Sequence, residues 1–126
     1  MVIYVIRHGE TDWNTKHWLQ GTTDIPLNRN GIEVAEITSE ALKGIPFDVI
    51  FSSPLKRAYQ TAEIMKRERQ IPLIVDERLK EISFGCFEGL CCTGPNYNIP
   101  DPDFPNFFQN PAHYNPPEGG ESIAEL

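Results

Sequence analysis

The chain has 126 residues, 40% of them hydrophobic, and a formal net charge of −7. This length suits one domain with a hydrophobic core, and no apolar run approaches the roughly 18 residues of a membrane helix. Residues 81–126 hold seven acidic and no basic residues, whereas acidic and basic residues balance in residues 1–80. A polyanion such as nucleic acid needs a basic track, so we expect neither a nucleic acid nor a membrane as partner.

Cysteine use and the N-terminus indicate the compartment. The chain has three cysteines, Cys86, Cys91 and Cys92, and no basic segment precedes its N-terminal apolar run. An odd number of cysteines without a signal peptide favours free thiols and a cytoplasmic protein. Neither His17 nor His113 stands at a metal-site spacing from them, so we expect no metal and no cofactor.

Three apolar runs in the first part of the chain predict strands. They lie at residues 2–6, 47–51 and 71–75. The first run is continuous, as expected for a strand that is buried on both faces of a sheet. Strands that alternate with helices predict an α/β protein, with a three-layer α/β/α arrangement around a mostly parallel sheet.

Two helices are predicted between these strands. Asn28 and Gly31 mark the start of the first helix, which runs to about residue 43 with apolar residues at helical spacing. Ser53, followed by Pro54 at the first helical position, predicts the start of the second helix. This order of elements predicts a single domain over residues 1–126.

Residues 89–120 differ in composition, because they contain seven of the eleven prolines. Long loops of this kind are uncommon unless they are functional or disordered. The aromatic residues Phe104, Phe107, Phe108 and Tyr114 argue against full disorder, since aromatic side chains favour burial. The segment is interpreted as a lid or insertion at the mouth of a site, with a partly ordered surface excursion as the alternative.

Charged side chains follow the predicted strands. Arg7 and His8 end the first strand, Arg57 lies on the first turn of the helix after the second, and Glu81 follows the third. Open parallel sheets bind ligands at the carboxyl ends of their strands, so we expect these side chains to converge. Helix N-termini also favour anions, which adds to the case for a phosphate site.

The residue types suggest roles in phosphoryl transfer. Arg7 and Arg57 can neutralise phosphate oxygens, and His8 can attack phosphorus if its other ring nitrogen donates to an acceptor such as the Gly9 carbonyl. Glu81 is the candidate acid for the leaving alkoxide. The loop after His8 carries further candidates for hydrogen bonds to the ester, namely Asn14, Gln20 and Gly21.

The residues alone leave alternatives open. A lone histidine is more often a structural hydrogen-bonding group than a nucleophile, although the flanking Arg7 favours the nucleophile here. Arg57 could instead pair with Glu63 or Asp48. Glu81 is the weakest assignment, because the nearby acidic residues Asp76, Glu77 and Glu88 make a solvated surface acid a serious rival.

Five runs of the sequence resemble the motifs of the histidine phosphatase superfamily, the phosphoglycerate mutase-like proteins. They are RHGET at 7–11, QGTTDIPL at 20–27, FSSPLKRA at 51–58, LKEISFGCFEG at 79–89 and PEGGES at 117–122. The resemblance implies a phosphohistidine intermediate on His8, a phosphate site with Arg7 and Arg57, and Glu81 as proton donor and acceptor. It implies no metal.

The chain departs from the family pattern in one respect. Members of the family have a second catalytic histidine on a later strand, which inserts between the first two strands described above. His113 follows no strand and matches no family motif, so the role is not assigned to it. We therefore expect residues 1–126 to be a truncated domain whose sheet is incomplete at the C-terminal side, completed by the remaining C-terminal part or by a swapped second chain.

Three functions compete. The leading hypothesis is a phosphomonoester hydrolase acting on a small phosphorylated metabolite. The second is a phosphoglycerate mutase, which is less favoured because residues 81–126 lack the cationic residues that bind phosphorylated acids. The third, of a different class, is a non-catalytic phosphate-binding fragment that retains Arg7, His8 and Arg57.

Overall fold

The computed structural model describes all residues from 1 to 126 and divides into two compact units. The sheet unit comprises residues 1–12 and 24–80, and the aromatic unit comprises residues 13–23 and 81–126. Each unit is therefore built from two separate stretches of the sequence. None of the helices has the length and apolar character needed to cross a membrane.

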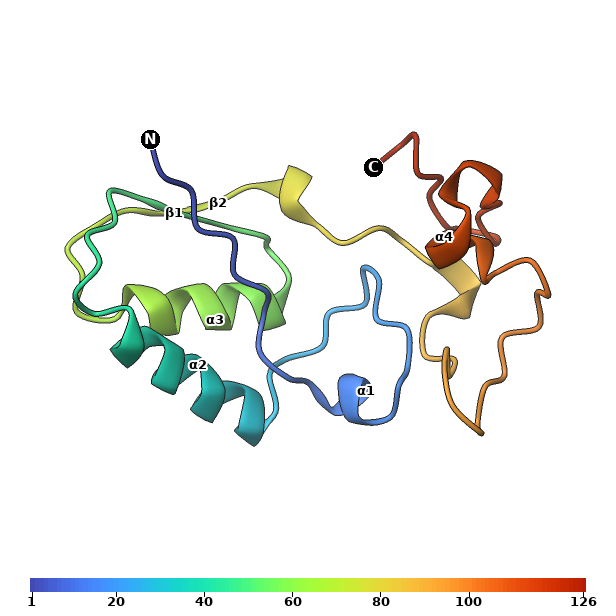
Figure 1. Cartoon of the computed structure of the whole chain (residues 1–126), viewed down its shortest axis with the longest axis horizontal. Coiled ribbons are helices and arrows are strands. Elements are labelled where there is room, and N and C mark those ends of the chain that lie inside the picture. Colours follow the sequence, from blue (N-terminus) through green and yellow to red (C-terminus); the bar gives the residue numbers. More distant parts are fainter. The chain divides into compact units, whose positions relative to one another are not determined.

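The sheet unit contains a small parallel sheet covered by helices on one face. Strand β1 (Ile50–Ser52) pairs in parallel with β2 (Leu73–Val75), and Phe51 lies opposite Ile74. Helix α3 (Lys56–Lys66) packs against both strands, and α2 (Arg29–Ala41) packs against α3 (Figure 1). These elements confirm the predicted mixed α/β class with a parallel sheet.

Helix α2 begins where the sequence predicts. The side chain of Asn28 accepts a hydrogen bond from the backbone N–H of Gly31 at 2.8 Å, which caps the helix N-terminus. The spacing of apolar residues does not mark the buried face, however, because Val34 and Ile37 are exposed. The buried residues of α2 are the small ones, Gly31 and Ala35, and the Ser39 hydroxyl donates to the Ile64 carbonyl of α3 at 3.0 Å.

Helix α3 begins later than predicted. Ser53 does not cap it, because its hydroxyl accepts from the Leu55 N–H at 3.3 Å and closes a turn that precedes the helix. The first helical N–H, that of Lys56, donates to the Asp24 carboxylate at 2.7 Å. A carboxylate from a distant loop therefore takes the capping role that the sequence assigned to Ser53.

The strand predicted at residues 2–6 is not formed. The sheet has only β1 and β2, and the N-terminal segment carries no regular secondary structure. Tyr4 packs edge-on against Phe47 with ring centroids 5.2 Å apart, but Val2 and Val5 are 77% and 93% exposed. A strand requires a neighbour for its backbone groups, and residues 2–6 have none in this sheet.

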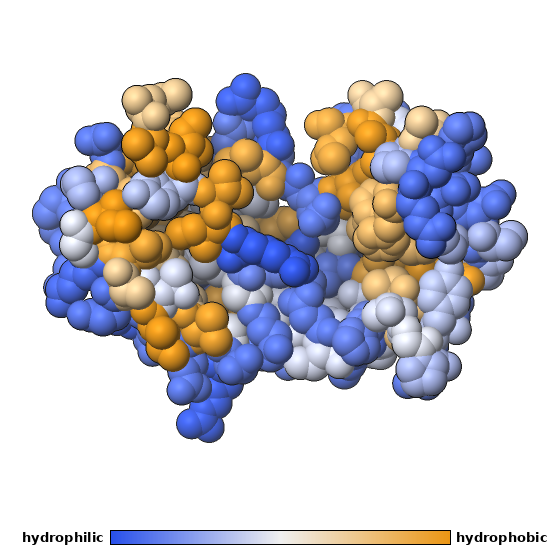
Figure 2. All heavy atoms as spheres, viewed as in Figure 1, coloured by the Kyte–Doolittle hydropathy of each residue, from blue (hydrophilic) through white to orange (hydrophobic).

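Apolar side chains of the sheet unit lie open to solvent, as Figure 2 shows over the part of the molecule that contains β1 and β2. On β1, Phe51 is 57% exposed, and on β2 Ile74 is 43% exposed. The face of the strands that α3 does not cover is therefore an apolar surface. We call residues 2–6 together with Phe51 and Ile74 the open apolar face.

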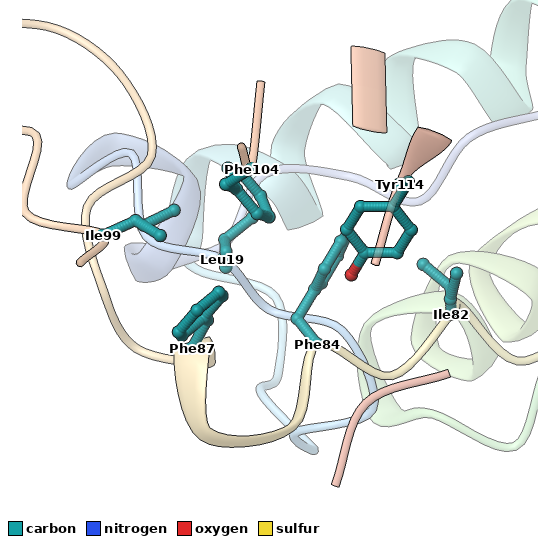
Figure 3. Packing of buried hydrophobic residues seen from close by; sticks show 7 residues of the cluster. All are labelled: Leu19, Ile82, Phe84, Phe87, Ile99, Phe104 and Tyr114. Carbon is teal, nitrogen blue, oxygen red and sulfur yellow. The ribbon is translucent and has the colours of Figure 1, made fainter. Parts of the chain in front are cut away.

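The aromatic unit has few regular elements and a well-packed core (Figure 3). Its helices are short: α1 (Asp12–Thr15) crosses the boundary between the units, and α4 (Asn106–Gln109) lies within the proline-rich segment. The core residues are Leu19, Ile82, Phe84, Phe87, Ile99, Phe104 and Tyr114. Residues 89–120 supply three of them, and Phe104 is only 1% exposed.

Antiparallel contacts join the two stretches of the aromatic unit. The Leu19 N–H donates to the Leu90 carbonyl and the Gly89 N–H to the Leu19 carbonyl, each at 2.9 Å. Trp18 forms an isolated β-bridge with Cys91. All three cysteines are free thiols, as the sequence predicts.

Candidate active site

His8 lies just after the N-terminal apolar segment, and its ring is fixed by its own neighbour. The Nδ1 atom is 2.7 Å from the Gly9 carbonyl oxygen. A carbonyl can only accept, so Nδ1 must carry the proton and the neutral ring has its lone pair on Nε2. This is the contact that the sequence suggests for a nucleophilic histidine.

Thr61 links the His8 loop to the helix that carries Arg57. The Gly9 N–H donates to the Thr61 hydroxyl oxygen at 3.1 Å, and this hydroxyl donates to the Arg57 carbonyl at 2.8 Å. The Thr61 side chain is buried, at 5% exposure. The backbone next to His8 is therefore tied to the backbone of Arg57 through one hydroxyl, a link that the sequence analysis missed.

The loop after His8 also packs tightly on the start of α2. A Cβ added to Gly9 would lie 2.5 Å from the backbone carbonyl oxygen of Gly31. A Cβ added to Gly31 would lie 2.1 Å from the backbone carbonyl oxygen of Glu10. The Glu10 carboxylate accepts from the side-chain amides of Asn28 at 2.9 Å and Asn30 at 3.1 Å. Two glycines and an Asn–Glu contact thus set the position of His8.

The two arginines occupy different environments. Arg57 is 2% exposed, whereas Arg7 is exposed. A charge away from bulk water is screened less, so the attraction between an anion and the Arg57 guanidinium is less weakened by salt than the attraction to Arg7. Arg7, His8 and Arg57 all belong to the sheet unit.

The predicted acid, Glu81, belongs to the aromatic unit. It is exposed, and its carboxylate accepts from the N–H of Ile82 at 3.2 Å. This contact joins Glu81 to the backbone of the next residue, and the Glu81 side chain is otherwise exposed to solvent.

The rival acids near Glu81 are engaged elsewhere. Asp76 forms an ion pair with Arg78 at 2.5 Å, and the hydrogen bonds from Arg78 lower the pKa of Asp76 to about 2. Glu77 pairs with Lys80 at 2.6 Å. Glu88 accepts hydrogen bonds from the backbone N–H groups of three residues, namely Thr22, Thr23 and Phe84.

The predicted ester-binding residues also lie in the aromatic unit. Gln20 and Gly21 are buried on the loop before Thr22, and the Gln20 carbonyl accepts from the Thr23 N–H at 3.0 Å. Asn14 is on α1, where its carbonyl accepts from the His17 N–H at 3.0 Å. His113 is exposed on a 3₁₀ turn.

Sequence reasoning missed the supporting contacts of two residues, Thr61 in the sheet unit and Glu88 in the aromatic unit. For Thr61 a signal existed, since a threonine four residues after Arg57 on a helix can donate to the Arg57 carbonyl. Glu88 gives no such signal, because its partners Thr22 and Thr23 are 66 and 65 residues away in the sequence.

A parallel α/β sheet with an arginine–histidine pair after the first apolar segment, and a buried arginine on the helix after β1, is typical of proteins that handle phosphate. Comparison with known families agrees, since the model of the histidine phosphatase superfamily (branch 1) matches residues 3–126. The chain belongs to this superfamily.

Individual relatives carry the names of phosphatases and of mutases. The chain is 41% identical over 104 residues to the uncharacterized phosphatase PhoE of Bacillus subtilis. The aligned stretch covers 82% of this chain and 54% of the relative. It is 40% identical over 86 residues to a probable phosphoglycerate mutase GpmB of Proteus mirabilis, over 68% of this chain and 40% of the relative. The chain thus spans about half the length of these curated relatives or less.

A solved structure shares the fold. YhfR of Bacillus stearothermophilus superposes with a TM-score of 0.83 at 38% sequence identity, over 94% of this chain and 58% of that one. The likeness therefore covers nearly all of residues 1–126.

Proposed function

We propose that the protein is a phosphomonoester hydrolase that acts through a phosphohistidine on His8. The observation that carries this proposal is the contact of 2.7 Å between His8 Nδ1 and the Gly9 carbonyl, which leaves the lone pair on Nε2. In the first step Nε2 attacks phosphorus, the P–O bond to the alcohol breaks, and the alkoxide takes a proton from the Glu81 carboxyl group. In the second step water attacks phosphorus, its proton passes to Glu81, and phosphate leaves His8.

The cations and the polar loop have distinct roles in this proposal. Arg7 and Arg57 hold the phosphoryl oxygens and offset the negative charge that develops on them. Asn14, Gln20 and Gly21 hydrogen-bond the ester. No metal and no cofactor is required by these steps. The substrate is a small phosphorylated metabolite, and the setting is the cytoplasm.

Phosphoglycerate mutase activity is the alternative within the same chemistry. In a mutase the phosphoryl group returns from the histidine to the bound acid instead of passing to water. Hydrolysis is favoured because residues 81–126 contain no lysine or arginine to bind a substrate carboxylate. An assay with phosphoglycerates decides: efficient isomerisation with little release of phosphate would reverse this order.

We also propose that residues 1–126 form part of a single domain whose sheet contains a further strand. The support is the open apolar face, on which Val5 is 93% and Phe51 is 57% exposed, since a folded sheet with helices buries such side chains. The strand comes from the remaining C-terminal part of the protein or from a swapped second chain. Residues 89–120 serve as a lid or insertion of this domain.

The test is phosphate release from a panel of phosphomonoesters by the full-length protein and its His8→Ala variant. We expect release by the wild-type protein and a loss of several orders of magnitude in the variant. Equal background rates for the two proteins would support the third hypothesis, a non-catalytic phosphate-binding protein. Intact mass and oligomeric state of the same sample identify the source of the additional strand.

A further inference from the structure

The side chain of Glu88 is surrounded by hydrogen-bond donors. One carboxylate oxygen, Oε1, accepts from the backbone N–H groups of Thr22 and Phe84, each at 3.0 Å. The other, Oε2, accepts from the Thr23 N–H at 2.9 Å and from the Thr23 hydroxyl. A carboxylate with both oxygens engaged by backbone donors forms strong, charge-assisted hydrogen bonds.

These donors come from two distant stretches of the chain. Thr22 and Thr23 end the loop that carries Gln20 and Gly21, and Phe84 lies three residues after Glu81. All of them belong to the aromatic unit. The Glu88 carboxylate therefore holds the predicted ester-binding loop against the segment that follows the predicted acid.

Gly21 shows how closely the loop approaches this carboxylate. A Cβ added to Gly21 would lie 2.1 Å from Glu88 Oε1 and 3.1 Å from the Ile82 carbonyl oxygen. Its φ of +52° is also in the left-handed region, which side chains other than hydrogen disfavour. Only glycine fits between the loop and the carboxylate.

We infer that Glu88 is a positioning residue that fixes the Gln20–Gly21 loop for binding of the ester group. The inference rests on the proposed function and deepens it. Glu88 takes no part in the chemistry itself, because its oxygens are committed to backbone donors. It acts on the substrate through the geometry of the loop, so its loss weakens binding more than it slows the reaction.

The Glu88→Gln variant is a sharp test because of where the donors lie. An amide has nearly the same shape as a carboxylate but replaces one oxygen with an N–H₂ group. Since Oε1 and Oε2 both face N–H donors, either orientation of the amide brings two donors together. The matched control is Glu118→Gln, which changes an exposed glutamate of the same unit.

The experiment measures steady-state kinetics of phosphate release by the full-length protein, together with hydrogen exchange of individual amides. For Glu88→Gln we expect KM to rise about tenfold or more with a smaller change in kcat, and faster exchange of the Thr22, Thr23 and Phe84 amides. Glu118→Gln should match the wild type in both. Unchanged KM, or a fall in kcat alone, would overturn the inference.

Two further variants keep the test decisive if Glu88→Gln unfolds. Thr23→Val removes one hydroxyl bond to Glu88 and should raise KM by about threefold, whereas Thr23→Ser should restore the wild-type value. An unchanged KM in Thr23→Val would count against the inference. The exchange data separate the positioning role of Glu88 from the proposed hydrolase activity. Faster exchange of the Thr22, Thr23 and Phe84 amides in Glu88→Gln supports the positioning role, even where His8→Ala shows the hydrolase proposal to be wrong.

Discussion

The sheet unit contains both strands and the two longest helices of the chain, whereas the aromatic unit contains only short helices and turns. Nevertheless, most of the exposed large apolar side chains belong to the sheet unit, including those of residues 2–6, Phe51 and Ile74. In the aromatic unit, by contrast, seven buried hydrophobic side chains pack into one cluster (Figure 3). Regular backbone hydrogen bonding and burial are thus separate matters, and a sheet buries its side chains only when both of its faces are covered.

The largest effect expected from this comparison is on stability. Phe104, at 1% exposure, touches several aromatic rings of the cluster, and its replacement by alanine should lower the free energy of unfolding by about 3–5 kcal/mol. In residues 1–126, the Phe51→Ala control should change it by no more than about 0.5 kcal/mol, because Phe51 is 57% exposed. Urea unfolding measures both.

Equal losses in the two variants would contradict this difference between the units, since they would show that Phe51 is covered in a chain of this length. The same two variants should be measured in the full-length protein. There we expect Phe51→Ala to become strongly destabilising, because the proposed additional strand covers the open apolar face.

The next effect is on activity and concerns the buried cation of the sheet unit. Arg57→Met should reduce kcat/KM for phosphate release by about 10²–10³-fold, as for loss of a group that stabilises developing charge. The reason is that Arg57, at 2% exposure, acts where water screens little. Arg67→Met is the control, because Arg67 is exposed and pairs with Glu36. Similar kcat/KM values for both variants would show that Arg57 does not contribute to phosphate release.

A smaller effect is expected from Thr61, the hydroxyl that joins the His8 loop to the Arg57 turn. Thr61→Val keeps the shape but removes the acceptor for the Gly9 N–H and the donor to the Arg57 carbonyl. We expect a loss of about tenfold in kcat/KM, and Thr61→Ser should recover most of it. Full activity in Thr61→Val would show that the position of His8 does not depend on this link.

The smallest effect concerns the pH dependence of stability in the sheet unit. Hydrogen bonds from Arg78 lower the pKa of Asp76 from 3.8 to about 2. A depressed pKa in the folded state stabilises the protein at pH values above 3.8, and this contribution is lost as pH falls toward 2. Asp76→Asn should therefore slightly flatten the decline in the free energy of unfolding between about pH 4 and pH 2. Acid unfolding curves that superpose with those of the wild type would contradict this.

The sequence predicted elements best where the signal is local. Asn28 identifies the start of α2, because its side chain caps the helix within four residues. Ser53–Pro54 misplaced the start of α3, since the cap comes from the distant Asp24. Residues 2–6 have the composition of a buried strand, but composition does not provide a partner strand.

The same limit applies to the candidate site. The His8–Gly9 contact could be anticipated because it joins adjacent residues. The partners of Glu88 and Gly9 could not, because Thr22 and Thr61 lie 66 and 52 residues away in the sequence. Motifs thus suggest candidate residues for the chemistry, while the residues that hold these candidates in place emerge only from the fold.

The most direct test of the account is to trap the phosphorylated protein. The full-length protein is mixed with a phosphomonoester, quenched with alkali within milliseconds, and digested for mass spectrometry. We expect an acid-labile, alkali-stable phosphoryl group on Nε2 of His8, present in the wild type and absent from His8→Ala. Turnover at the wild-type rate in His8→Ala, with no phosphorylated histidine in either protein, would contradict the account.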